Sequence, residues 1–278
     1  MSHSPSYLLR DALAASGAIL LSVIFSVALI VPLVSVEPEI NLGNRLMEPS
    51  YSAPFGTDRM GMDLLMSIIW GARSTLLMAL STVGFCILIG VPIGLVAGYY
   101  RNWICDALMR LSDIAMAVPE IMVAIAIAQT LGPSAGSVIF ALSITYWPFW
   151  ARLVYAETRS MRNEVFIESA QALGASPWRI MILHILPGLI PSIIVRTSVG
   201  IGATILSTVT LSCLGLGPPP PTPEWGRIIS ESRDYLPDAW WYPLAPGLAV
   251  FVTVLSFYLF GDGLRRAFSP RSYGFYSR

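Results

Sequence analysis

The chain has 278 residues, of which 55% are hydrophobic and only 12% are charged. Soluble domains carry about 25% charged residues, so this composition excludes an ordinary soluble domain and predicts a protein that crosses a membrane several times. The formal net charge is zero, which gives no electrostatic basis for binding nucleic acid. All 17 basic residues are arginine. Without lysine, the chain has neither the phosphate-binding lysine of a P-loop ATPase nor a Schiff-base residue.

Six apolar segments are each about twenty residues or longer, which is the length that an α-helix needs to cross a bilayer. They lie at 15–35, 74–98, 108–131, 135–156, 189–214 and 243–262. We predict that the first is an uncleaved helix and not a signal peptide, because a single arginine precedes it and no cleavage site of small residues follows. We therefore expect one all-α polytopic membrane domain, comprising residues 1–278 and crossing the membrane six times.

The arginines predict the orientation of these helices, because positively charged residues concentrate on the inner side of a membrane. With the N-terminus inside, twelve arginines fall on inner loops and helix ends, and five fall on the outer side. The twelve are Arg10, Arg101, Arg110, Arg152, Arg159, Arg162, Arg179, Arg196, Arg265, Arg266, Arg271 and Arg278. This N-in, C-in orientation places the loop 157–187 in the cytoplasm and the loops 36–73 and 215–242 outside.

We expect neither a disulfide framework nor a metal site. The cysteines Cys86, Cys105 and Cys213 are far apart and lie in or beside apolar segments. The two histidines, His3 and His184, are isolated as well, whereas a metal site needs several converging ligands. The sequence motifs of hydrolases and intramembrane proteases are missing, so we expect no catalytic residue.

The cytoplasmic loop contains two predicted short helices that meet at a glycine. Residues 163–173 can form a helix whose buried face holds Val165, Ile167, Ala170 and Leu173. Gly174 stands where the end of a helix favours the left-handed conformation.

A second helix is predicted directly after this glycine. Ser176 can cap it, and Pro177 suits its first position, where a missing N–H costs nothing. The helix continues through Trp178, and Pro187 is expected to interrupt it. Such an amphipathic elbow is suited to docking on a soluble partner, although a loop lying on the bilayer surface would show the same pattern.

The elbow carries an ordered pattern of acidic, small and proline residues. Its members are Glu168, Ser169, Ala170, Gly174, Ala175, His184, Leu186 and Pro187. The pattern resembles the EAA loop of bacterial ABC importer permeases, with Ser169 in place of the usual alanine. His184 replaces the usual isoleucine, and the resulting His-Ile-Leu-Pro sequence is similar to the dipeptide/oligopeptide/nickel branch of that family.

Three further segments resemble the same branch. They are 55–73, which begins Phe-Gly-Thr-Asp, 213–226, which ends Pro-Glu-Trp-Gly, and 261–265, Gly-Asp-Gly-Leu-Arg. Met62 stands where the family usually has arginine, and Phe268-Ser269-Pro270 replaces the usual Leu-Asp-Pro. The resemblance covers roughly residues 55–270, so it concerns the whole fold and not a single motif.

The resemblance implies a type I ABC importer permease fold in the bacterial inner membrane, with the elbow as the coupling helix that sits in a groove of an ATPase. It also implies the partners. These are a second homologous permease, two ABC ATPase subunits, a periplasmic or lipid-anchored substrate-binding protein and membrane lipid. No cofactor is expected on this chain, because ATP and Mg²⁺ would bind to the ATPases.

Glu120 is the first candidate for the translocation path, and Gln129 and Tyr146 are weaker ones. A carboxylate about a third of the way into a membrane helix is costly, so it should face a cavity or a partner. Two interpretations stay open. Glu120 either meets the amino group of a substrate or forms a structural hydrogen bond to a neighbouring helix.

The outer loop 215–242 is rich in proline, and its backbone is therefore stiff. Within it, Pro221, Glu224 and Trp225 are candidates for contact with the binding protein or for the outer gate. The alternative is a rigid connector whose aromatic residues lie at the level of the lipid headgroups.

The leading prediction is a transport subunit for dipeptides or oligopeptides that catalyses no covalent reaction. The same motifs occur in permeases for nickel and for metallophore- or opine-type compounds, so the sequence leaves the substrate open. A channel or secondary transporter is a remote alternative, because such proteins carry more buried charge or inverted repeats with broken helices.

Overall fold

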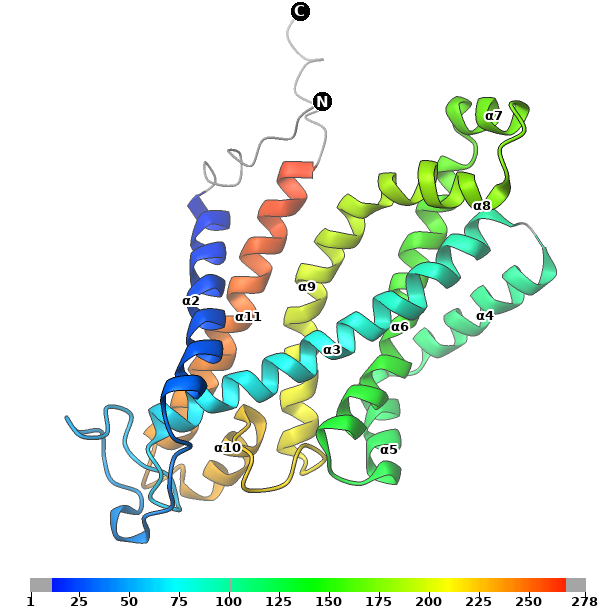
Figure 1. Ribbon diagram of the computed structural model, residues 1–278. Coiled ribbons are helices and arrows are strands. Elements are labelled where there is room, and N and C mark those ends of the chain that lie inside the picture. Colours follow the sequence, from blue (N-terminus) through cyan, green and yellow to red (C-terminus); the bar gives the residue numbers. More distant parts are fainter. Residues whose placement is uncertain (1–11, 101, 269–278) are drawn as a thin grey trace, which may run out of the picture.

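The computed structural model describes residues 12–100 and 102–268, and this part of the chain forms helices and loops without a β-strand (Figure 1). The elements are α2 (Ala12–Val34), η1 (Leu42–Asn44), α3 (Leu64–Tyr99), α4 (Trp103–Ala117), α5 (Glu120–Leu131), α6 (Ala135–Met161), α7 (Val165–Ala172), α8 (Pro177–Ile180), the π-helical turn η2 (Met181–Ile185), α9 (Leu186–Cys213), α10 (Trp225–Ser232), η3 (Arg233–Tyr235) and α11 (Trp241–Phe268). Arg10, Arg101, Arg271, Arg278, His3, Ser269 and Pro270 lie outside the described residues.

The number of predicted spans is confirmed. Five of the described helices are long and apolar enough to cross a membrane, and the bent pair α4 and α5 can form a sixth span. The helices extend beyond the predicted segments. For example, α3 starts at Leu64 and not at residue 74, because the Asp63 side chain caps it by accepting a hydrogen bond from the Met66 N–H (2.9 Å).

The third predicted span is not one continuous helix. The axes of α4 and α5 meet at 90°, so the expectation of a single helix over 108–131 is wrong. Pro119 causes the break, because its ring removes an N–H and pushes the preceding Val118 into extended backbone (φ −91°, ψ 137°). The span also starts earlier than predicted, at Trp103, where the Asn102 side chain caps α4.

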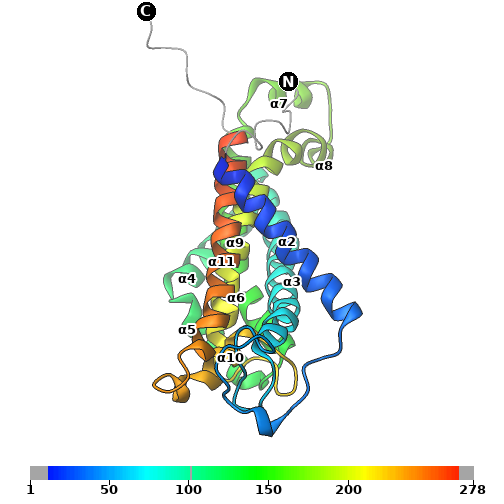
Figure 2. The same cartoon turned by 90° about the vertical axis from the view of Figure 1, so that its left-hand side faces the viewer.

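The long helices lie side by side (Figures 1 and 2). α2 packs on α11, α11 packs on α9, and α3 packs on both α9 and α6. α2 begins and α11 ends at the end of the molecule that carries α7 and α8, whereas the loop 36–63 and α10 lie at the opposite end. Both ends of the described part and the elbow therefore lie at the same end of the molecule, as the N-in, C-in prediction requires.

The packing of α3 on α6 depends on glycines that face the α6 backbone. A Cβ atom added at Gly90 would lie 2.7 Å from the Trp147 carbonyl oxygen. Additions at Gly94 and Gly98 would likewise meet the α6 backbone, at Gly94 the carbonyl oxygen of Ala151. Membrane helices associate mainly by such close packing of small residues, because lipid supplies no hydrophobic force between them.

Trp150 of α6 joins this contact to α9. Its side chain is buried, and its ring lies against the position that a Cβ atom would occupy at Gly200 of α9 (2.9 Å). The guanidinium group of Arg196, also on α9, lies 5.6 Å from the centre of the same ring, which is cation–π geometry. Trp150 thus ties α3, α6 and α9 into one packed unit.

We expect Gly94→Ala to destabilise the protein and Gly84→Ala, on the same helix, to leave it stable. A methyl group at position 94 collides with the α6 backbone, and overpacking of this kind costs about 1–3 kcal/mol. A methyl group at position 84 meets nothing within 4 Å. Thermal unfolding of the two purified variants in detergent measures the difference, and equal melting temperatures would contradict the glycine contact.

Candidate functional site

The elbow is anchored to the membrane helices through one fully buried residue of α7. Ile167 packs in a cluster with Leu95 and Tyr99 of α3, Val154 of α6 and Ile180 of α8. The predicted first helix and the burial of Ile167 are therefore confirmed. A displacement of α7 would be transmitted to α3 and α6 through this cluster, because packed side chains do not deform freely.

A left-handed glycine ends α7, as predicted. Gly174 has φ +79°, its N–H donates to the Gln171 carbonyl oxygen (2.9 Å), and the Ala175 N–H donates to the Ala170 carbonyl oxygen (3.1 Å). These two bonds form a Schellman motif. A Cβ atom added at Gly174 would meet nothing within 4 Å, so the backbone conformation, and not a lack of space, favours glycine here.

The second helix starts as predicted but does not stop at Pro187. The Ser176 side chain accepts a hydrogen bond from the Arg179 N–H (3.4 Å), and Pro177 occupies the first helical position. From Pro177 the helix continues to Cys213. The expected interruption at Pro187 is therefore wrong.

A π-helical turn explains why the helix continues. It comprises residues 181–185, and its widened pattern appears in the bond from the Leu186 N–H to the Met181 carbonyl oxygen. In a regular helix the ring of Pro187 would collide with the carbonyl group four residues earlier, and a wider turn relieves that collision. His184 lies in this turn, and its Nδ1 atom is buried without a hydrogen-bond partner among the described residues.

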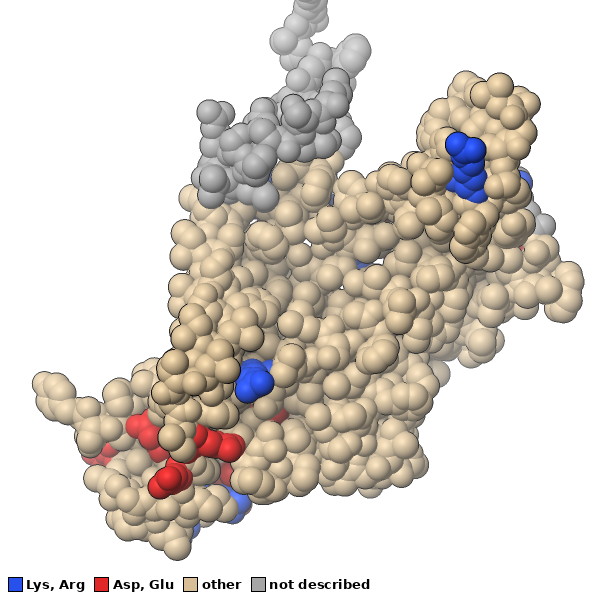
Figure 3. Space-filling model, in the orientation of Figure 1, with Lys and Arg blue, Asp and Glu red and all other residues tan. Residues whose placement is uncertain are grey.

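Five apolar residues of the elbow are exposed on its surface. Val165 and Leu173, which were predicted to be buried, are 75% and 88% exposed, so that part of the prediction is wrong. Phe166, Trp178 and Leu183 are also exposed on α7 and on the helix that follows it. We call these five residues the elbow face. In Figure 3 the elbow protrudes at the upper right with a largely uncharged surface.

Glu168 and Ser169 lie on the exposed side of α7, beside the elbow face. The Ser169 hydroxyl donates to the Val165 carbonyl oxygen (2.8 Å), which satisfies its proton within the helix. Leu186 is partly buried, and Pro187 is exposed at the start of α9. Elbow residues named from the sequence therefore divide into an internal set that shapes the turn and an exposed set that a partner can reach.

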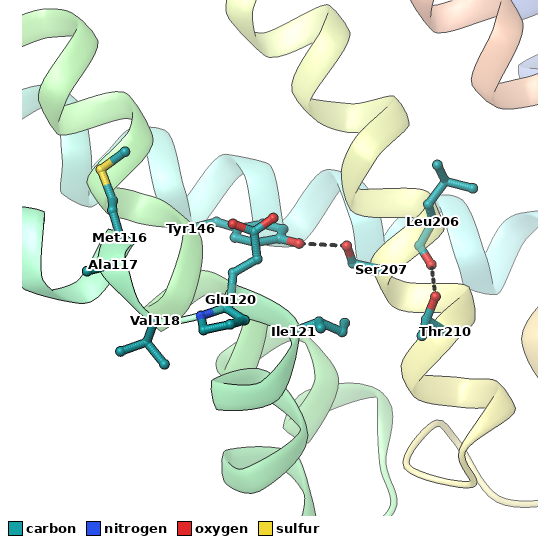
Figure 4. A pocket seen from close by; sticks show the side chains of 10 residues that line it. Met116, Ala117, Val118, Glu120, Ile121, Tyr146, Leu206, Ser207 and Thr210 are labelled. Atoms are coloured by element: carbon teal, nitrogen blue, oxygen red, sulfur yellow. Dashed lines mark hydrogen bonds between the residues drawn. The ribbon is translucent and has the colours of Figure 1, made fainter.

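A second site lies at the bend between α4 and α5, in a pocket that is open to the surface of the chain, where Glu120 and Thr210 are exposed. The bend opens a cavity of about 640 Å³, lined by residues 116–121, Tyr146 of α6 and three residues of α9. Glu120 is the first residue of α5 and does not lie inside a continuous helix as expected. Figure 4 shows its carboxylate directed into the cavity beside the Tyr146 ring. The structure thus brings two predicted path residues together.

The third predicted path residue is not part of this cavity. Gln129 is exposed on α5 and does not contribute to the lining. Instead the opposite wall comes from Ser207 and Thr210 of α9, which the sequence analysis missed. Their spacing of three residues places both hydroxyl groups on one face of α9, but α9 carries many other Ser and Thr residues, so the sequence alone does not single them out.

The outer loop is fastened to α3 by buried side chains. The carboxylate of Glu224 accepts hydrogen bonds from the Arg227 N–H (2.9 Å) and the Thr75 hydroxyl (3.1 Å), and burial raises its pKa above the usual value. The Trp225 indole N–H donates to the Ile68 carbonyl oxygen (2.8 Å). Both side chains are buried, so the expectation that they contact a binding protein directly is wrong. Pro221 is exposed.

Comparison with known proteins shows the family to which this chain belongs. Residues 90–272 match the family described as "Binding-protein-dependent transport system inner membrane component". The dipeptide transport system permease protein DppC of Alkalihalophilus pseudofirmus is 40% identical over 94% of this chain and 87% of its own length. The glutathione transport system permease protein GsiD of Pectobacterium atrosepticum is 41% identical over 82% of this chain and 76% of its own.

Two further comparisons concern another relative and the fold. The di/tripeptide transport system permease protein DppC of Pseudomonas aeruginosa is 38% identical over 78% of this chain and 71% of its own. A chain of the MetNI methionine ABC transporter, solved in an inward-facing conformation, superposes with a TM-score of 0.61. That match covers 73% of this chain and 97% of the other at 19% identity, and so shows a common fold.

Proposed function

Because this chain belongs to the family of binding-protein-dependent transport system inner membrane components, we propose that it forms half of the pathway through which an ATP-driven importer carries dipeptides or oligopeptides. It is a multi-pass protein of the bacterial inner membrane. A second homologous permease would supply the other half of the pathway. The relatives support short peptides as the substrate, because their names specify dipeptides, glutathione and di- or tripeptides.

The elbow supports the proposed link to ATP hydrolysis. Contiguous exposed apolar residues on a protein surface mark interaction sites, and the elbow face lies at the inner end of the molecule. Glu168 and Ser169 add polar groups next to it. We assign this surface to an ATPase subunit, which would bind the ATP and Mg²⁺. This chain has no lysine for a phosphate-binding loop.

Two packed connections would carry movement from the elbow to the pathway. Ile167 joins α7 to α3 and α6, and the continuous helix from Pro177 to Cys213 joins the elbow directly to α9. α6 and α9 carry Tyr146 and Ser207, which line the cavity at the α4–α5 bend. Closure of the ATPases would thus shift the walls of the cavity, as alternating access requires.

The outer surface would receive the substrate-binding protein. Pro221 is exposed in a stiff proline-rich segment, and Glu224 and Trp225 hold the start of α10 against α3. In this arrangement the buried pair keeps the loop in place and the exposed proline segment provides the contact. Because Glu224 and Trp225 are bonded to α3, they would move with that helix and would take part in an outer gate.

Uptake into cells that carry the complete transporter, with and without this subunit, tests the proposed function. Labelled dipeptide and labelled nickel are supplied in parallel. We expect dipeptide entry that depends on the subunit, because the exposed elbow and the membrane cavity are both needed for import. Entry of nickel without dipeptide would contradict the proposed substrate and leave an importer for metal complexes. If each compound entered cells that lack the subunit as fast as cells that contain it, the subunit would have no role in transport.

We expect Gly174→Val to uncouple transport from ATP hydrolysis. The substitution forces a β-branched residue to φ +79°, a strain of about 1 kcal/mol or more, and distorts the corner of the elbow. Gly215→Val is the matched control, because Gly215 has φ +80° and equally open surroundings and ends α9 in the same Schellman motif, far from the elbow.

Uptake and ATP hydrolysis are measured in proteoliposomes with each variant. The expected result is loss of uptake with continued hydrolysis for Gly174→Val and near-normal uptake for Gly215→Val. Wild-type uptake by Gly174→Val would argue against the coupling role. Equal losses in both variants would mean that backbone strain alone is responsible.

A further inference from the structure

Glu120 is a carboxylate without a counter-ion in the described part of the chain. No arginine or histidine among the described residues forms an ion pair with it, and its side chain makes no hydrogen bond there. The ion pair nearest along the chain joins Asp113 to Arg152 and leaves Glu120 out. Glu120 is exposed in the single chain, and an unpaired carboxylate on a membrane-spanning segment calls for a partner from elsewhere.

The position of Glu120 along its helix strengthens the need for such a partner. Eleven residues separate it from Leu131 at the far end of α5, a rise of about 16 Å. Eleven residues also separate Tyr146 from Ala135 at the start of α6, which gives about 16 Å again. Both residues therefore lie about 16 Å along their helix axes from the α5–α6 turn, within segments that are long and apolar enough to cross a bilayer core of about 30 Å.

The opposite wall of the pocket offers hydroxyl oxygens that can accept hydrogen bonds from a donor group on a substrate. The Ser207 hydroxyl donates to the Ala203 carbonyl oxygen (3.2 Å), and the Thr210 hydroxyl donates to the Leu206 carbonyl oxygen (2.8 Å). The Tyr146 and Ser207 hydroxyl oxygens lie 2.6 Å apart, and either hydroxyl can donate that bond (Figure 4). The Thr210 proton is used within α9, and the Tyr146–Ser207 bond uses one proton of that pair, so all three hydroxyl oxygens keep lone pairs that can accept a hydrogen bond.

We propose that Glu120 and the Tyr146–Ser207 hydroxyl pair form a subsite for the protonated amino group of a peptide in transit. An ammonium group has three N–H donors and a positive charge, which match one carboxylate and several oxygen lone pairs. The pocket of about 640 Å³ is open to the surface and has room for such a group beside the carboxylate. This inference rests on the proposed function, because it takes a peptide as the substrate.

An arginine of the second permease is the competing partner for Glu120. Such an ion pair would need neither a cavity of this size nor the oxygen acceptors of α6 and α9. The geometry therefore favours a substrate group, and the experiment below distinguishes the two.

The test uses the complete transporter in proteoliposomes, with its binding protein saturated by peptide. Two probes are compared, alanyl-alanine and N-acetyl-alanyl-alanine, and the affinity of the binding protein for each is measured separately. We expect Glu120→Gln to lower the maximal uptake of alanyl-alanine tenfold or more, Glu120→Asp to retain most of it, and Tyr146→Phe to lower it several-fold. Glu48→Gln is the control, since Glu48 is an exposed carboxylate in the loop 36–63.

The decisive quantity is the uptake of alanyl-alanine divided by the uptake of N-acetyl-alanyl-alanine. It should be high in the wild type and fall toward one in Glu120→Gln. An unchanged ratio with equal loss of both probes would overturn the inference, as would loss of co-purification with the second permease. Wild-type uptake of alanyl-alanine by Glu120→Gln would overturn it while leaving the proposed function intact. No peptide uptake by the wild type itself would instead refute the proposed function.

Discussion

The close contact between the backbones of α3 and α6 fixes the relative positions of the elbow, the membrane cavity and the outer loop. α3 carries Ile68 and Thr75, to which Trp225 and Glu224 attach the outer loop. α6 carries Tyr146, and its inner end packs with Ile167 of the elbow. Because glycines let the two helices touch along their length, a shift at one end cannot be absorbed by loose packing before it reaches the other.

The bend at Pro119 has the opposite effect, because it removes packing. The axes of α4 and α5 meet at 90°, and an open pocket lies between this bend, α6 and α9. The same bend places Glu120 at the start of α5, where its side chain enters the cavity. One proline thus creates both the opening and the position of its only acidic lining residue. Tight packing on one side of α6 and open space on the other suit a helix that transmits movement to a pathway.

Features that depend on neighbouring residues were predictable from the sequence. The turn at Gly174, the cap at Ser176 and the number of membrane spans follow from local backbone chemistry and hydrophobic length. Features that depend on distant contacts were not. The burial of Glu224 requires Thr75, which lies 149 positions away in the chain, and the exposure of Leu173 requires knowing that no helix of this chain covers it.

The errors at the two prolines have a common cause. A proline in a membrane helix can break it, kink it or be accommodated by a wider turn, and the local sequence does not decide between these outcomes. Pro119 breaks its helix, whereas Pro187 follows a π-helical turn and the helix continues. The difference arises from packing: residues Met181 and Ile185 of the π-helical turn are buried against α3 and α6, while Val118 is exposed.

Photo-crosslinking from the elbow to an ATPase subunit tests the central claim most directly. A photoreactive amino acid replaces Leu173, which is 88% exposed on the elbow, and in a control it replaces Leu88, which is 69% exposed on α3. In native membranes we expect a crosslink from position 173 to the ATPase, whose yield changes with bound nucleotide, and none from position 88. No ATPase crosslink from position 173 in the assembled transporter would contradict it.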